Sequence, residues 1–143
     1  MMRKIYIRLV LAVLFCILFV SCGKIHTEAD IQGNWQGTYE GKDILFVFNT
    51  DKTCVLKFVD KQSNTTDIIN GNYELDLSKK PIPMSIRNIP QLNYPLHTII
   101  EFIGDDSIRI ADFSPRWRLR PISFSNGKVM NLVRIDSAKK QTL

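Results

Sequence analysis

The most unusual side-chain chemistry in the sequence lies in the stretch DFSPRWRLRP, residues 112–121. Arg116, Arg118 and Arg120 alternate there with a tryptophan and a leucine. Successive side chains of an extended strand point to opposite faces, so the three arginines would share one face. A guanidinium pairs well with carboxylate or phosphate. The pattern therefore predicts either an anion-binding site or an amphipathic strand whose arginines are solvated or paired with acids.

The other reactive side chains lack the partners that catalysis or metal binding needs. Cys54 sits in an alternating apolar stretch and is expected to be a small buried hydrophobe. The two histidines, His26 and His97, have no partners at metal-ligand spacing. Asp105 and Asp106 fit a hairpin turn and no EF-hand loop. No nucleophile elbow, phosphate-binding loop or zinc-protease motif occurs, so we expect no enzyme, no cofactor and no metal.

Cys22 is the residue with the clearest predicted chemistry. An uninterrupted run of 12 apolar residues, 9–20, follows three basic residues. That length suits a secretion signal, because a membrane-spanning helix needs about 20 apolar residues. Residues 19–22 read FVSC and resemble the lipobox of bacterial lipoproteins, although phenylalanine replaces the commoner leucine. The resemblance implies cleavage before Cys22 and attachment of acyl chains such as palmitate to it.

These signals divide the chain into a signal peptide at 1–21, a lipidated tether at 22–30 and a folded domain at 31–143. The expected location is the cell envelope, with the membrane as a partner through the lipid on Cys22. Gly23 is not the aspartate of an inner-membrane retention signal, which favours the outer membrane if the cell is Gram-negative.

The charge of the exported part excludes one class of partner. The whole chain carries a formal charge of +5, but the signal peptide removes three of the 19 basic residues and none of the 14 acidic ones. The remainder is close to neutral, at about +2, and nothing in it calls for nucleic acid.

The folded part reads as a series of short strands separated by turn residues. No stretch of ten or more residues after the signal has helical periodicity. Asn126-Gly127 is the strongest two-residue hairpin signal and precedes the last strand. This spacing predicts an antiparallel sandwich or barrel. The expected strands are 34–40, 44–49, 53–60, 68–77, 84–87, 96–103, 108–111 and 128–135.

A resemblance to a known fold family narrows this choice. Gly33-Asn34-Trp35 matches the G-x-W opening of lipocalins, whose tryptophan packs across the closed end of the barrel. GNYELDLSKKP at 71–81, GDDSIRI at 104–110 and RPISF at 120–124 resemble, in the same order, a family of small bacterial lipocalin-like lipoproteins of undefined function. The resemblance implies a single antiparallel, up-and-down, lipocalin-like β-barrel of about eight strands, with Trp35 as its plug.

Two binding functions follow, beside a purely structural role. A lipocalin-like barrel could bind a small apolar or anionic ligand, with Arg116, Arg118 and Arg120 as the candidate ligand-binding residues. Alternatively, a barrel with a filled core could be an envelope inhibitor or scaffold that binds a protein through the Arg116–Arg120 segment and Tyr94. The residues expected to face inward are Leu45, Val47, Val55, Phe58, Ile69, Tyr73, Ile99, Phe102, Ile110 and Val133.

Overall fold

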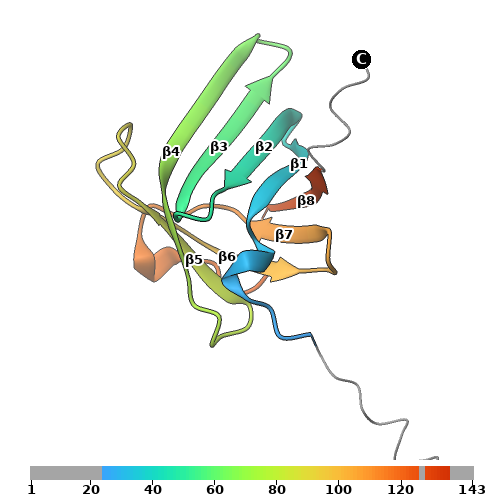
Figure 1. The fold of residues 1–143 in the computed structure, drawn as a ribbon. Coiled ribbons are helices and arrows are strands. Elements are labelled where there is room, and N and C mark those ends of the chain that lie inside the picture. The colour runs from blue at the N-terminus through green and yellow to red at the C-terminus, as the bar shows by residue number, and fades with distance from the viewer. Residues whose placement is uncertain (1–23, 126–127, 136–143) are drawn as a thin grey trace, which may run out of the picture.

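The computed structural model describes residues 24–125 and 128–135 and shows a closed, entirely antiparallel barrel of eight strands in chain order (Figure 1). The predicted single antiparallel, up-and-down β-barrel of about eight strands is therefore confirmed. The barrel closes because β1 pairs with both β2 and β8. The strands are β1 (Gly33–Tyr39), β2 (Lys42–Phe48), β3 (Thr53–Asp60), β4 (Thr65–Leu75), β5 (Ile82–Arg87), β6 (Leu96–Phe102), β7 (Ser107–Ala111) and β8 (Val129–Ile135).

Side chains alternate between the inside and the outside of the barrel, and bulky groups fill the inside. On β2, for example, Ile44, Phe46 and Phe48 are buried, whereas the residues between them are partly exposed. The buried side chains form one contiguous hydrophobic cluster that also includes Trp35 and Tyr73. The interior is thus occupied by large aromatic and aliphatic groups.

The expected inward face is wrong on several strands. Leu45 and Val47 are partly exposed, and Val133 is 50% exposed while Leu132 is buried. Ile99 is buried, but the core cluster contains its neighbour Ile100 and not Ile99. The error is a shift by one residue, and it arises because strands such as ILFVF are apolar on both faces. Tyr73 and Ile110 are buried in the core as expected.

One end of the barrel, here named the closed end, is covered by the 3-10 turn η1 (Glu28–Asp30). Trp35 is completely buried there, and its indole N–H donates a hydrogen bond to the carbonyl of Ile31 at 2.7 Å. The guanidinium of Arg134 lies over the indole ring at 4.2 Å from its centroid. Trp35 is therefore the predicted plug of the barrel.

The connection from β7 to β8 leaves the opposite end of the barrel. Residues 112–125, here named the cover segment, contain the 3-10 turn η2 (Trp117–Leu119) and no strand. Asn126 and Gly127 lie outside the described residues, but the strand that a hairpin needs directly before them is missing. The predicted two-residue hairpin itself falls on these two residues and stays a prediction. In Figure 1, η2 lies at the left of the barrel, whereas the described N-terminal chain leaves at the lower right.

Within the described residues, no helix is long and apolar enough to cross a membrane. The predicted signal peptide and Cys22 lie outside those residues.

Candidate functional site

The cover segment packs on the outer face of β5 and β6. Ser85 lies between Met84 and Ile86, whose side chains belong to the interior core, so Ser85 points outward. His97 on β6 is paired with Ser85 across the sheet and shares its face. Both residues are nevertheless buried, at 6% and 4% exposure. Polar side chains on the outside of a barrel are buried only where another segment covers them.

The backbone of the cover segment is fastened to the same strand. Ser114 and His97 form an isolated antiparallel bridge, in which each amide donates to the carbonyl of the other at 2.8 and 2.9 Å. This bridge adds one residue pair between β6 and the chain that follows β7. The cover segment is therefore held in a defined position rather than attached only at its two ends.

Arg120 completes the attachment with its side chain. One Nη2 hydrogen donates to the Oγ of Ser85 at 2.7 Å, and the same nitrogen lies 3.2 Å from Nδ1 of His97. Ser85 Oγ lies 2.9 Å from that Nδ1. Because a guanidinium only donates, the consistent arrangement has Ser85 accepting from Arg120 and donating to an unprotonated Nδ1.

The electrostatics of this cluster favour the neutral form of His97. Its pKa is lowered, first by burial and then by the positive charges of Arg120 and Arg87. A proton on Nδ1 would face the Arg120 guanidinium and remove the acceptor of the Ser85 hydroxyl. The cluster is thus one cation with two neutral partners, and no carboxylate of the described residues forms an ion pair with Arg120.

Arg120 also has hydrogen-bonding capacity that the described protein groups leave unused. Its Nε is buried and has no partner among them. A buried donor without a partner costs about 1–3 kcal/mol, more when it is charged. Arg120 lines a cavity of about 260 Å³ together with residues that include Asp112, Ile122 and Phe124. The cavity lies between the cover segment and the facing ends of β7 and β8.

The outer surface of the cover segment carries a second group of side chains, here named the exposed patch: Arg116, Trp117, Arg118, Leu119 and Ile122, of which Ile122 also borders the cavity. Trp117, Leu119 and Ile122 are 67%, 63% and 87% exposed. No ion pair to Arg116 or Arg118 occurs within residues 24–125 and 128–135. The predicted extended strand is wrong, because the 3-10 turn places Arg120 inward and leaves Arg116 and Arg118 outward with the apolar residues.

The turn forms for a local reason. The hydroxyl of Ser114 donates to the carbonyl of Arg116 at 3.0 Å, and the amide of Leu119 donates to the same carbonyl. Pro115 and Pro121 flank the turn and cannot donate to a sheet, so a regular strand is disfavoured there. These two prolines were the sequence signal against the strand interpretation.

Cys54, Cys22 and Tyr94 are the remaining candidate residues. Cys54 is buried in the core, and burial raises the pKa of its thiol to about 12, so its expected role as a small hydrophobe is confirmed. In the part of the chain that the structure describes, no three His, Cys, Asp or Glu side chains are placed to hold a metal ion. Cys22 lies outside it. Tyr94, the other expected contact residue, is 46% exposed and lies on the β5–β6 loop.

Sequence reasoning missed Ser85 and His97 as partners of Arg120. The strand IPMSIR places a serine among apolar residues. Its burial on the outer face could not be predicted, because the sequence does not show which segment covers that face.

Comparison with protein-family models, with curated proteins and with solved structures finds no match to this chain.

Proposed function

We propose that this protein is a lipid-anchored envelope lipoprotein whose barrel is a filled scaffold and whose exposed patch binds an acidic protein partner. The observation that supports it is the exposed patch itself. Two arginines without ion pairs among the described residues flank a tryptophan, and a leucine follows them; all four side chains are exposed to solvent. Tryptophan and arginine are the side chains most enriched at energetic hot spots of protein interfaces.

The charge of the region favours an acidic partner. No acidic residue occurs between Phe113 and Ile135, whereas five basic residues do. An acidic surface with an apolar depression would pair with Arg116 and Arg118 and receive Trp117. The position of the cover segment is set by the Ser114–His97 bridge, so little ordering entropy remains to oppose binding.

The test is capture of a partner with matched variants. A lipid-free domain that begins at residue 24 is immobilised and exposed to envelope extract, and retained proteins are quantified. The patch variant is Arg116→Ala/Trp117→Ala/Arg118→Ala. The control is Lys57→Ala/Lys61→Ala/Ile68→Ala, which also removes two cations and one apolar side chain, but from β3, β4 and the turn between them.

We expect wild type and control to retain the same acidic protein and the patch variant to lose it by more than about tenfold, the effect of about 1.4 kcal/mol. Equal retention by all three proteins would rule out the patch as the binding surface.

The anchor has a separate test. Wild-type protein should incorporate a clickable palmitate analogue and fractionate with membranes, and Cys22→Ala should do neither. If Cys22→Ala remains in the membrane fraction, lipid anchoring at Cys22 is wrong.

The buried side of the cover segment supports a second candidate function, the binding of a small carboxylate or phosphate beside Arg120. Its basis is the cavity together with the unused Nε of a guanidinium that has no carboxylate partner among the described residues. Native mass spectra of the domain from bacterial periplasm should show excess mass that disappears on denaturation. The excess should also be lost in Arg120→Gln. A clean mass for freshly prepared wild type, with no gain on adding acetate or phosphate, would count against this candidate.

A further inference from the structure

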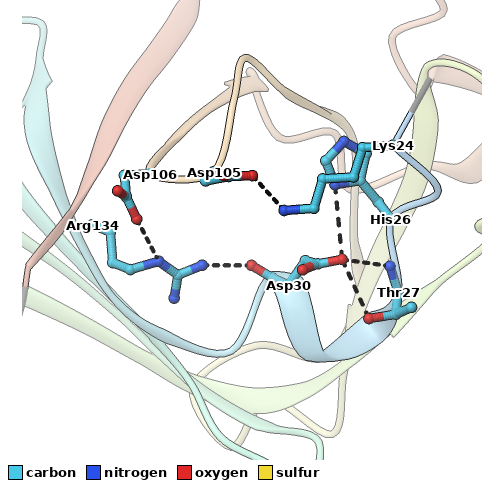
Figure 2. A network of polar contacts seen from close by, with 7 residues as sticks. All are labelled: Lys24, His26, Thr27, Asp30, Asp105, Asp106 and Arg134. Atoms are coloured by element: carbon cyan, nitrogen blue, oxygen red, sulfur yellow. Dashed lines mark hydrogen bonds and ion pairs between the residues drawn. The ribbon is translucent and has the colours of Figure 1, made fainter. Parts of the chain in front are cut away.

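The chain that leads into β1 is fastened to the closed end of the barrel over its whole described length (Figure 2). Lys24 forms an ion pair with Asp105 in the β6–β7 turn. The ring of His26 stacks on Phe102 at 4.2 Å between centroids and an interplanar angle of 11°. The first described residues of the chain therefore contact Phe102 and Asp105, which are far from them in sequence.

The next residues continue the attachment. The Asp30 carboxylate accepts hydrogen bonds from the backbone amide and hydroxyl of Thr27, at 2.6 and 3.2 Å. The guanidinium of Arg134 donates to the carbonyls of Asp30 and Gln32 and pairs with Asp106 at 3.3 Å. We name this set of contacts, from Lys24 to Gln32, the N-terminal clamp. Single exposed ion pairs contribute little to stability. Here they act together with the stacking of His26 on Phe102 and with the hydrogen bonds from the partly buried Arg134.

The clamp fixes how far Cys22 can be from the barrel. Cys22 lies two positions before Lys24, and each residue of extended chain spans at most about 3.6 Å, so the two α-carbons lie within about 7 Å of each other. The barrel wall is longer than this. The seven residues of β1 span about 23 Å at 3.3 Å per residue.

We infer that the closed end of the barrel faces the membrane that holds the lipid, and that the cover segment is presented away from it. This inference rests on the proposed function, since it requires the lipid on Cys22. The tether is too short to let the barrel turn over. The β7–β8 connection and the β1–β2 turn, joined by the Lys128–Glu40 ion pair, form the opposite end.

The orientation restricts which molecules the exposed patch can contact. A surface on the half of the barrel farther from the anchoring membrane contacts molecules in the space above that membrane and not its lipid headgroups. Trp117, Leu119 and Ile122 resemble a membrane-inserting group in composition, but the clamp places them at the wrong end for that membrane. This geometry therefore favours a macromolecular partner that contacts the exposed patch on the part of the protein that faces away from the membrane.

The chain contains two tryptophans, and they mark the two ends. Trp35 belongs to the closed end and Trp117 to the cover segment. The full lipidated protein is reconstituted into liposomes that carry a trace of dansyl-labelled phosphatidylethanolamine, and tryptophan-to-dansyl energy transfer is measured. Wild type is compared with Trp117→Phe, which leaves Trp35 as the only donor and changes one exposed side chain.

Transfer efficiency per tryptophan should rise in Trp117→Phe, because the distant donor has been removed. Equal or lower efficiency, or a blue shift of Trp117 emission on reconstitution, would overturn the orientation by placing the patch at the lipid. Failure of the protein to float with the liposomes would overturn the proposed anchor instead, so the two failures are distinct.

A variant of the clamp provides the internal control. Lys24→Gln/His26→Ala should reduce the difference between wild type and Trp117→Phe, since the tether then lets the barrel tumble. Lys79→Gln removes an exposed lysine on the β4–β5 loop at the same end and should leave the difference unchanged. If the clamp variant behaves like Lys79→Gln, the clamp does not set the orientation.

Discussion

Arg134 on β8 covers the indole of Trp35 on β1, with its guanidinium carbon 4.2 Å from the ring centroid. The same guanidinium donates to two carbonyls of the chain that enters β1. One side chain from the last strand thus joins the plug, the entering chain and the closure of the barrel.

Replacement of Arg134 should therefore destabilise the fold. We expect Arg134→Ala to lower the free energy of unfolding by about 2–3 kcal/mol, because a cation–π contact and two charged hydrogen bonds are lost together. Urea denaturation followed by Trp35 fluorescence measures this. Arg87→Ala, which removes an exposed pair with Glu74, should change stability by less than about 0.5 kcal/mol. Similar losses in both variants would refute a special role for Arg134.

Gly37 is required where β1 meets β8. A Cβ at this position would lie 2.3 Å from the backbone carbonyl oxygen of Asn131, which cannot move without disturbing the pairing that closes the barrel. Gly37→Ala should cost about 1–3 kcal/mol, the usual effect of overpacking. Gln36→Ala, at the exposed neighbouring position, should be close to neutral in the same thermal or urea melt. An unchanged melt for Gly37→Ala would contradict the close approach.

Cys54 should be unreactive in the folded protein. It is 1% exposed, and burial raises its pKa to about 12, so very little thiolate exists at neutral pH. In the lipid-free domain, where Cys54 is the only cysteine after residue 23, a chromogenic disulfide reagent should react at the rate of unfolding. Urea above the unfolding midpoint should release one rapidly reacting thiol. Fast labelling in native buffer would show that the core around Cys54 opens.

His97 should make stability depend on pH in a defined window. Its pKa is lowered in the folded state, so the unfolded chain binds more protons between that pKa and the usual value of about 6.5. Stability then falls as pH decreases through this window and is retained above it. His97→Gln should flatten this part of the curve in urea titrations.

The aspartates provide the comparison for this experiment. The pKa values of Asp30, Asp51 and Asp76 are lowered by hydrogen bonds, so their contribution is lost only below about pH 4, in wild type and variant alike. A curve for His97→Gln that still falls as the pH decreases from about 6.5 toward the range of the aspartates would exclude His97 as its cause.

The positions of all eight strands follow from the sequence, because alternation and turn residues are local signals. Thr53–Asp60 was predicted at its observed bounds, and the others lie within about three residues of theirs. Trp35 as the plug was implied by the resemblance of Gly33-Asn34-Trp35 to the lipocalin opening, and Cys54 as a core residue by its place in an alternating apolar stretch.

The tertiary structure alone decided which face of the apolar strands points inward. Ile44, Phe46 and Phe48 compete with Leu45 and Val47 for the interior, and only closure of the barrel selects between them. It also separated the three arginines. Arg120 turns inward to Ser85 and His97, 35 and 23 residues away, whereas Arg116 and Arg118 remain outside. Strand formation depends on residues two positions apart, but burial of Arg120 depends on partners that only the folded barrel brings within hydrogen-bonding distance.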